Sequence, residues 1–287
     1  MAIVLDNITY TYGVGTPFEK TALKGISVTI ENGEFLGIIG HTGSGKSTFV
    51  QHLNGLLHPT TGKVTVNGVD VSEKTDEAKH MRHKVGMVFQ YPEHQLFEET
   101  IAEDIAFGPK NLGLDAEEVD RRVREAMAFV GLDYDTYAER SPFHLSGGQM
   151  RRVAIAGVVA MEPDFLVLDE PSAGLDPFGR EEIFDEIIKL HKEKDVTVIL
   201  VSHNMEDISR MANRLIVLDK GQIVLDGKPL DIFNHHRHVL QQVGVDVPPV
   251  SVLIESLRNR GLDVSNEVLT VDDAVQAILE GGGQHVK

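Results

Sequence analysis

The feature that most constrains this chain is a glycine-rich loop at residues 40–48, Gly-His-Thr-Gly-Ser-Gly-Lys-Ser-Thr. It fits the pattern G-x-x-x-x-G-K-[ST], a P-loop, whose backbone N–H groups bind phosphate oxygens. An apolar run at 34–40 predicts a buried strand before the loop, and residues 46–54 suit a helix after it. This strand–loop–helix context favours a phosphate-binding loop over a glycine-rich turn that binds nothing.

The residues of this loop have expected roles towards a nucleotide. The glycines let the backbone wrap closely, and the N-terminus of the following helix adds partial positive charge. Lys46 is expected to reach the β- and γ-phosphates, the Ser47 hydroxyl to hold Mg²⁺, and Thr48 to lie near the α-phosphate. The expected nucleotide-binding residues of the loop are Gly40, His41, Thr42, Gly43, Ser44, Gly45, Lys46, Ser47 and Thr48.

Two later apolar runs also end in polar side chains. The run at 165–170 ends in Asp169 and Glu170, the pattern of a Walker B segment, which predicts Asp169 near Mg²⁺ and Glu170 beside the attacking water. The run at 196–202 is followed by His203. A lone histidine at a strand end is usually structural or solvated, but ligands bind at the carboxyl ends of parallel strands. We therefore expect these side chains to converge with the P-loop.

A second anion-binding helix N-terminus is predicted at Leu145-Ser-Gly-Gly-Gln149. Ser146 is expected to cap a helix over 150–161, and Gly147 and Gly148 leave its first N–H groups open. The segment has no lysine, so it does not predict a second P-loop.

Tyr12 lies upstream of the P-loop on a segment that alternates as a strand does. An aromatic ring at this place can stack on a nucleotide base. From position alone, an ordinary strand tyrosine is the preferred interpretation.

Length, charge and residue composition exclude several classes of protein. The 287 residues allow one large or two moderate domains, and a hydrophobic content of 41% supports a sizeable core. A net charge of −17 argues against nucleic-acid binding through phosphate neutralisation and fits a basic partner. The absence of cysteine excludes disulfides and thiolate metal sites, and is compatible with a reducing cytoplasm. Neither a signal peptide nor a membrane-spanning run of about 20 apolar residues is predicted.

The character of the chain changes at about residue 229. We expect a main domain over 1–228, with a mainly helical part at about 91–160, and a small helical domain over 229–287. Within the small domain, the segments 251–259 and 271–280 are amphipathic, so their apolar positions pack internally or on a second subunit.

Three histidines, His235, His236 and His238, cluster at the start of the small domain. Such a cluster can bind a metal ion, but no carboxylate or cysteine pattern accompanies it. A solvated helix face is the preferred interpretation.

Together these motifs resemble the ATP-binding cassette (ABC) ATPase family over about residues 3–227 and stand in the family's order. The matching segments are Gly40–Thr48 as Walker A, Gln90 as the Q-loop, Leu145–Gln149 as the signature, Phe165–Glu170 as Walker B, Ser172–Asp176 as the D-loop and His203 as the switch histidine.

This resemblance implies an α/β fold, a P-loop NTPase cassette with a RecA-like parallel sheet, an antiparallel β-subdomain and an α-helical subdomain. It also implies ATP hydrolysis with Mg²⁺ in a head-to-tail dimer, where the signature of one chain faces the P-loop of the other. Tyr12 then becomes the base-stacking aromatic, with Tyr10 as the alternative.

The resemblance further assigns roles to the catalytic residues. Glu170 is expected to orient and deprotonate water, while Lys46 cradles phosphates and His203 contacts the γ-phosphate. The residues expected around Mg²⁺ are Ser47, Gln90 and Asp169, and those expected at the nucleotide from the signature and D-loop are Ser146, Gly147, Gly148, Gln149 and Asp176.

Within the ABC family, the sequence around these motifs is most similar to the ATPases of energy-coupling factor (ECF) transporters. Of their two paralogous ATPase subunits, it is most similar to the second. The segments that carry this similarity are 15–20, 40–43, 89–97, 107–111 and 149–157.

The ECF resemblance implies uptake of vitamins or transition-metal ions. The implied partners are a second, paralogous ATPase, a transmembrane coupling subunit and a membrane substrate-capture subunit, with no nucleic acid. The implied location is the cytoplasmic face of the cell membrane, as a peripheral protein. Glu93, Glu98 and Glu99 suit a basic partner, although a solvated acidic loop fits them equally well.

Other functions remain open at this point. The main rival is the ATPase of an ordinary ABC importer. A soluble ABC ATPase of DNA repair or the ribosome lacks support, because no long insertion lies between Gln90 and Leu145 and only one cassette is present. A purely regulatory nucleotide-binding module does not explain Glu170 and His203.

Overall fold

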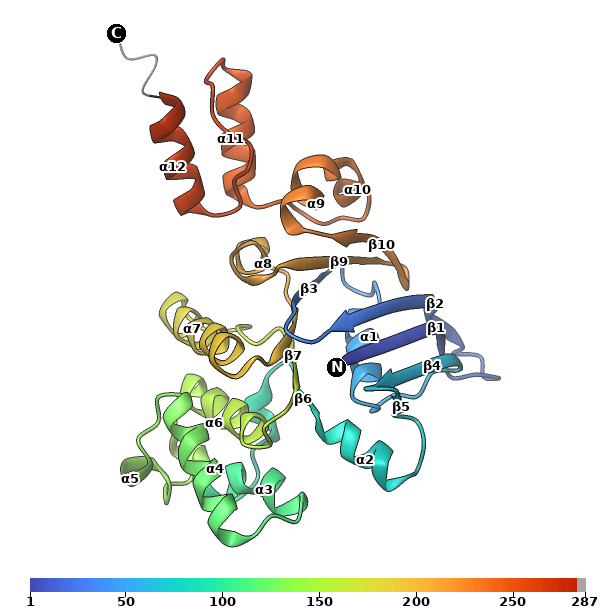
Figure 1. The fold of residues 1–287 in the computed structure, drawn as a ribbon, viewed down its shortest axis with the longest axis vertical. Coiled ribbons are helices and arrows are strands. Elements are labelled where there is room, and N and C mark those ends of the chain that lie inside the picture. The colour runs from blue at the N-terminus through green and yellow to red at the C-terminus, as the bar shows by residue number, and fades with distance from the viewer. Residues whose placement is uncertain (283–287) are drawn as a thin grey trace.

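The fold, seen in a computed structural model that describes residues 1–282, contains two β-sheets, a helical part and a C-terminal helical pair (Figure 1). The segment 283–287 of the predicted C-terminal domain lies outside the described residues. The strands are β1 (Ala2–Tyr12), β2 (Lys20–Glu31), β3 (Phe35–Ile39), β4 (Thr61–Val66), β5 (Val69–Asp70), β6 (Val85–Val88), β7 (Phe165–Asp169), β8 (Thr197–Val201), β9 (Arg214–Asp219) and β10 (Gln222–Gly227).

The central sheet has the strand order β10-β9-β3-β8-β7-β6. From β6 to β9 neighbouring strands pair in parallel, and β10 joins as an antiparallel hairpin with β9. Every residue of β3, β7 and β8 is buried, as expected for parallel strands covered on both faces. The P-loop, Glu170 and His203 therefore follow three adjacent strands at the same edge of the sheet.

A second, antiparallel sheet has the order β2-β1-β4-β5. Helix α1 (Lys46–Leu53) lies between the two sheets, with Phe49 and Leu53 fully buried among Ile3 and Leu5 of β1. The alternating apolar positions of β1 and β2 thus cover the helix that begins at the P-loop.

The helical part lies at one end of the molecule, below the central sheet in Figure 1. Its helix α4 (Ala116–Phe129) buries Val119, Val123 and Met127 in the main core. The elements of this part are η1 (Pro92–Gln95), α3 (Ile101–Asn111), α4, α5 (Tyr134–Tyr137), η2 (Pro142–His144) and α6 (Gly147–Val159).

These elements confirm the predicted α/β fold with a parallel core, an antiparallel sheet and a helical block. Helix α2 (Asp76–His83), whose only buried residue is Ala78, was not predicted from the sequence. The remaining helices are α7 (Pro177–Lys194), α8 (Met205–Met211), α9 (Pro229–His235), α10 (Arg237–Gln242), α11 (Pro249–Asn259) and α12 (Val271–Gly282).

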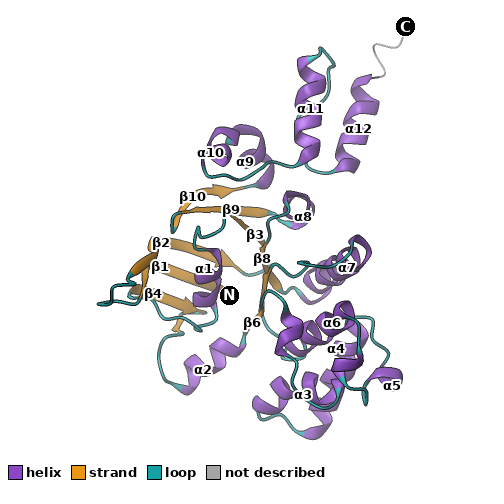
Figure 2. Cartoon of the chain, turned by 180° about the vertical axis from the view of Figure 1, so that it is seen from behind, coloured by secondary structure: helices purple, strands orange, loops and turns teal. Residues whose placement is uncertain are grey.

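Two separate hydrophobic clusters organise the C-terminal segment. Phe233 of α9 and Leu240 of α10 are fully buried in the main core. Helices α11 and α12 instead pack on each other through a small cluster that includes Ile254 and Ala274. Figure 2 shows this helical pair projecting from the end of the molecule beyond α9 and α10.

Among residues 1–282, no helix combines the length and apolarity that crossing a bilayer requires.

Candidate nucleotide-binding site

Positive backbone dihedrals shape the P-loop between β3 and α1. Gly40 has φ 153° and Gly45 has φ 110°, a region that residues with side chains rarely adopt. A Cβ atom on Gly40 would lie 2.3 Å from the carbonyl oxygen of Leu218, so the strand β9 also excludes a side chain there. The loop conformation therefore depends on glycine at these positions.

The loop opens into a cavity of about 490 Å³. Residues from widely separated motifs line this cavity together, as expected from their places at the carboxyl ends of the strands. The predicted site residues that line it are Tyr12, Thr42, Gly43, Gly45, Lys46, Ser47, Thr48, Gln90, Asp169, Glu170 and His203.

Lys46 lies at the floor of the cavity and is almost fully buried. Its Nζ donates hydrogen bonds to the carbonyl oxygens of Gly40, at 2.6 Å, and His41, at 3.2 Å. Burial lowers the pKa of Lys46, while the negative charges of Glu170 and Asp169 oppose that shift. The ammonium group is thus held in place by carbonyl oxygens of the P-loop itself.

Two other loop residues support the backbone and do not line the cavity. The His41 ring lies with Nδ1 2.7 Å from the carbonyl oxygen of Thr42 and Nε2 2.9 Å from Asp219 Oδ1. Ser44 is buried, and its carbonyl oxygen accepts a hydrogen bond from Gly221 N at 2.9 Å. These contacts tie the loop to β9 and to the turn that follows it.

Asp169 is the last residue of β7 and is almost fully buried. Burial raises its pKa, while a hydrogen bond from Ser47 and the positive charge of Lys46 oppose the increase. Asp169 and the Ser47 hydroxyl therefore face each other across the cavity floor.

Glu170 follows Asp169 with a left-handed backbone, φ 53°, which is unusual for a residue with a side chain. Burial, and then the negative charge of Asp169, raise the pKa of Glu170 to about 7. A buried carboxylate whose pKa lies near neutral pH is suited to act as a general base.

His203 faces Glu170 from the end of β8. Its Nε2 lies 3.3 Å from Glu170 Oε1, although the two atoms are not aligned for a hydrogen bond. Burial, and then the positive charge of Lys46, lower the pKa of His203. At neutral pH the imidazole is therefore mainly uncharged and can donate one hydrogen bond.

Tyr12 and Tyr10 occupy different positions at the cavity. Tyr12 lines it, is 41% exposed, and its hydroxyl lies 3.1 Å from Thr48 Oγ1. Tyr10 packs behind it with ring centroids 4.8 Å apart, and also contacts His52. Only Tyr12 presents a ring to the cavity, so it is the better placed of the two for stacking on a base.

Several residues of the cavity wall, from β2 and from the β9–β10 turn, were not predicted from the sequence. They were missed because no motif marks them; only strand pairing brings them to the loop. These additional lining residues are Lys20, Thr21, Ala22, Lys24 and Lys220.

The signature residues and Asp176 do not line this cavity. Ser146 caps α6 through a capping box, accepting from Gln149 N at 3.3 Å while Ser146 N donates to Gln149 Oε1 at 3.1 Å. Asp176 caps α7 by accepting from Gly179 N at 2.7 Å. These residues stand at two other helix N-termini.

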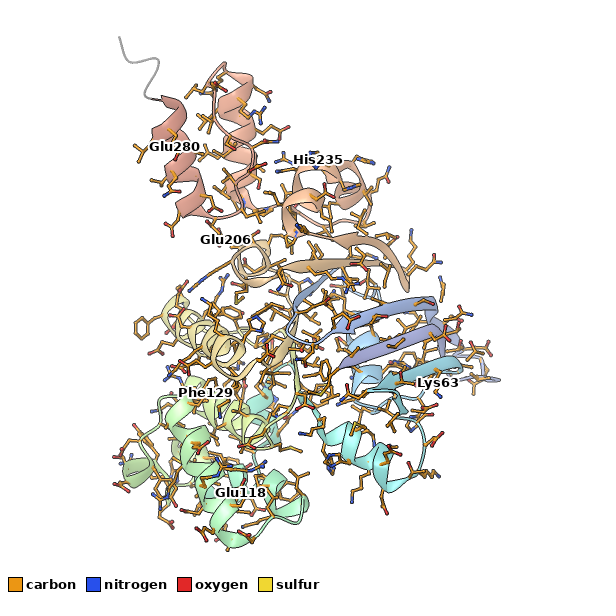
Figure 3. All side chains as sticks on the ribbon, in the orientation of Figure 1. Lys63, Glu118, Phe129, Glu206, His235 and Glu280 are labelled. Carbon is orange, nitrogen blue, oxygen red and sulfur yellow. The ribbon has the colours of Figure 1, made fainter. Side chains whose placement is uncertain are left out.

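The histidine cluster is exposed and partly paired with Asp231. His235 Nδ1 lies 2.9 Å from Asp231 Oδ1, and His236 Nε2 lies 3.7 Å from Asp231 Oδ2. Figure 3 labels His235 on α9, between the central sheet and the C-terminal helical pair. Across the part of the chain that the structure describes, no group of three His, Cys, Asp or Glu residues is arranged to hold a metal.

Comparison with known proteins agrees with this geometry. A family model described as ABC transporter matches residues 23–173. The chain is 55% identical to the energy-coupling factor transporter ATP-binding protein EcfA2 of Clostridium perfringens over 280 residues, which cover 98% of both chains. It is 53% identical to the protein of the same name from Clostridium tetani, over 98% of this chain and 97% of that one.

A solved structure of cbiO1 from Clostridium perfringens, described as part of the ABC transporter complex cbiONQ, superposes with a TM-score of 0.73. It is 34% identical and covers 88% of this chain and 98% of its own. The chain belongs to the ABC transporter family and, within it, to the energy-coupling factor transporter ATP-binding proteins.

Proposed function

We propose that the cavity binds ATP with Mg²⁺ and that Glu170 activates the water that attacks the γ-phosphate. The observation that carries this proposal is the meeting of Lys46, Asp169, Glu170 and His203 in one cavity at the end of the P-loop. Hydrolysis of this kind needs positioning and charge stabilisation more than covalent chemistry, and these residues supply both.

Oxygen donors at the cavity floor fit Mg²⁺. The candidate ligands are the Ser47 hydroxyl, the Gln90 side chain and Asp169, all of which line the cavity. Mg²⁺ is usually held by one or two carboxylates together with phosphates and water, so a set with a single carboxylate is sufficient. When bound, the ion would neutralise phosphate charge, and these residues would fix where it binds.

Glu170 and His203 have complementary roles in this proposal. A carboxylate with a pKa of about 7 can accept a proton from water near neutral pH. The neutral His203, whose Nε2 lies 3.3 Å from Glu170 Oε1, donates its one hydrogen bond towards a γ-phosphate oxygen. Tyr12 stacks on the adenine base at the open side of the cavity.

The signature segment acts on the nucleotide of a partner ATPase in a head-to-tail pair. The support comes from the room around its glycines. A Cβ on Gly147 would meet nothing within 4 Å, and one on Gly148 would meet only Leu175, at 3.8 Å. Packing within the chain therefore does not require glycine here, whereas close approach of a phosphate to the N-terminus of α6 does.

The partner ATPase in this proposal is a second, paralogous subunit, and α11 and α12 form part of the contact. These helices expose apolar side chains, while their buried apolar side chains form a cluster of their own. The pair is also bonded to the preceding helices, through Arg237 to Glu255 and to the Ser251 carbonyl oxygen. The exposed residues are Val252, Leu253, Val271, Val275 and Leu279.

The segment after Gln90 is proposed to meet a transmembrane coupling subunit, which would place the chain at the cytoplasmic face of the membrane. Phe97 and Phe107 are exposed and pack edge to face, with ring centroids 4.9 Å apart. Glu93 is bound within the chain by Arg151, so Glu98 and Glu99 remain as the acidic groups for a basic partner. A separate membrane subunit then captures the vitamin or metal ion.

The ATPase chemistry is tested with Glu170→Gln. The variant should bind ATP with unchanged affinity and lose at least a hundredfold in turnover, because the general base is removed while the cavity keeps its shape. Unchanged turnover would contradict the role of Glu170.

The partners are tested by tagging the chain, purifying it from detergent-solubilised membranes and identifying each accompanying chain by mass. A related ATPase, a multi-spanning basic protein and a small membrane protein are expected. Recovery of two large permeases would instead indicate an ordinary importer.

A further inference from the structure

One arginine outside the nucleotide cavity contacts two segments that line it. Arg151 lies in the first turns of α6, just after the signature, and is only 2% exposed. Its side chain crosses from the helical part towards the central sheet. A buried guanidinium must find acceptors for its N–H groups, so its partners are informative.

The first partner is Glu93, in the short helix η1 that follows Gln90. Arg151 Nη2 lies 3.0 and 3.1 Å from the two carboxylate oxygens of Glu93, and Nε lies 3.2 Å from Oε2. This paired geometry fixes orientation as well as distance. The two residues are far apart in the chain, and no sequence motif joins them.

The second partner is the backbone that follows Glu170. Arg151 Nη1 donates to the carbonyl oxygens of Ala173, at 2.6 Å, and Pro171, at 3.3 Å. Ala173 N in turn donates to the carbonyl oxygen of Glu170 at 3.1 Å, which closes a turn that begins at Glu170. The guanidinium therefore holds the far end of the turn that carries the proposed general base.

Both of the segments held by Arg151 begin at a strained residue. Glu170 has φ 53°, and Tyr91, which follows Gln90 and starts the turn containing Glu93, has φ 56°. Left-handed backbone at residues with side chains persists only where the surroundings enforce it. Arg151 contacts both turns at once.

We propose that Arg151 is a positioning residue for ATP hydrolysis, holding the turn after Gln90 and the turn at Glu170 in a single arrangement. The proposal rests on the role proposed above for Glu170. Arg151 does not contact the nucleotide cavity itself and acts only through these two turns. A shift of Gln90's segment is thereby transmitted to Glu170's segment through one side chain.

An ion pair that only stabilises the fold is the competing interpretation, and the chain offers a matched control for it. Arg122 of α4 is partly buried, with a side chain 14% exposed, and bonds to Glu118, to Glu162 and to the carbonyl oxygens of Ala160 and Met161. Glu118, labelled in Figure 3, places this second arginine in the helical part, and neither residue lines the nucleotide cavity. Arg122→Lys should therefore perturb folding without moving Glu170.

The experiment measures ATP turnover on the complex purified through a tag on the full chain. Glu170→Gln first defines the share of turnover that depends on this chain. Arg151→Lys keeps the charge but cannot bridge a carboxylate and two carbonyls in a plane. We expect it to lower that share of kcat about tenfold, because a small misplacement of a base is costly, with KM for ATP within twofold.

Glu93→Gln should lower kcat in the same direction, and the double variant should lose no more than Arg151→Lys alone, because the two residues act as a unit. Arg122→Lys should keep kcat within twofold.

Three results would overturn the proposal. They are a kcat within twofold of wild type in Arg151→Lys, an equal loss in Arg122→Lys, or additive losses in the double variant. Unchanged turnover in Glu170→Gln would remove the proposed role of Glu170 and this inference with it, and is recognised independently of the arginine variants.

Discussion

Glu170 illustrates how burial prepares a carboxylate for chemistry. Its pKa is raised to about 7 by burial and by the charge of Asp169, while Lys46 opposes the increase. The active form of the proposed general base is deprotonated, so the raised pKa predicts that activity should be lost as pH falls through about 7. Below that pH the carboxyl is mostly protonated and cannot accept a proton from water.

The first prediction concerns this titration. The kcat/KM for ATP, which reports the free enzyme, should fall about tenfold per pH unit below 7 and level off above it. Asp207 also raises the pKa of Glu170, so Asp207→Asn should move the midpoint to lower pH. Steady-state ATPase assays across pH 5.5–8.5 provide the measurement. A flat profile between pH 6 and 8 would contradict the assignment.

For single residues of the cavity, the sequence predicts those that lie within contiguous motifs. It does not predict those that strand pairing brings to the cavity. Lys46 and Ser47 are recognised by their spacing in the P-loop. Lys20 and Lys24 reach the cavity only because β2 runs beside the loop. The contact between Arg151 and Glu93 joins distant segments that are each unremarkable by themselves.

At the scale of helices and strands, side chains that cap helix N-termini fix where several helices begin. Thr75 caps α2 by accepting from Ala78 N at 3.1 Å, and Ser146 caps α6 through its capping box. A cap of this kind contributes about 1 kcal/mol in either helix. Only the cap of α6 stands at the proposed contact with the partner's nucleotide. This difference separates a structural cap from a functional one.

The second prediction compares these caps. Thr75→Ala and Ser146→Ala should each cost about 1 kcal/mol of stability, seen as a fall of about 2–4 °C in the thermal midpoint. Only Ser146→Ala should also lower ATP turnover. Calorimetry and ATPase assays on the same preparations test this, and an equal loss of turnover in both variants would argue against the signature's role.

The third prediction uses the open space at the start of α6. Gly147→Ala introduces no contact within 4 Å inside the chain, and alanine suits a helix better than glycine, so stability should stay the same or rise slightly. Turnover should fall by more than tenfold, because the added methyl group obstructs a phosphate from the partner site. Full activity in a stable Gly147→Ala variant would count against the head-to-tail arrangement.

Apolar periodicity located most elements but could not reveal α2. The strands at 34–40, 165–170 and 196–202 are continuous apolar runs, which burial in a parallel sheet requires. Helix α2 has almost no apolar face, since only Ala78 is buried. Its remaining signals are the Thr75 cap and the acidic first turn, and these are weak without an apolar stripe.

At the scale of the whole molecule, the C-terminal segment divides more finely than its composition indicates. The sequence predicts a domain from residue 229. Phe233 and Leu240 nevertheless belong to the main core, while α11 and α12 have a cluster of their own. We therefore propose Pro248 as the boundary of the detachable part.

The fourth prediction follows from that division. Removal of 249–287 should lower the thermal midpoint only slightly, because it takes away bonds of Asn234 and Arg237 but no fully buried residue of the main core. It should leave ATP binding unchanged and weaken co-purification of the partner ATPase. Removal of 229–287 should instead lower the midpoint by several degrees, because it takes Phe233 and Leu240 out of the core. Equal effects of the two truncations would show that the proposed boundary is misplaced.

The lysines at the mouth of the cavity have a consequence for how the chain meets its nucleotide. Lys20, Lys24 and Lys220 present positive charge on a molecule whose net charge is −17. At low ionic strength the screening length is about 30 Å, so the negative charge of the whole surface repels ATP. At physiological salt the screening length is about 8 Å, so only the lysines at the mouth interact appreciably with ATP.

Salt should therefore act in two directions on nucleotide capture by the isolated chain. The association rate should rise between about 10 and 150 mM salt as long-range repulsion is screened, and fall again once the local attraction is screened as well. Stopped-flow binding of a fluorescent ATP analogue would detect this maximum, and charge removal at Lys24 should flatten the falling side. The acidic surface and the basic mouth together make the chain best suited to capture ATP at the ionic strength of a cell.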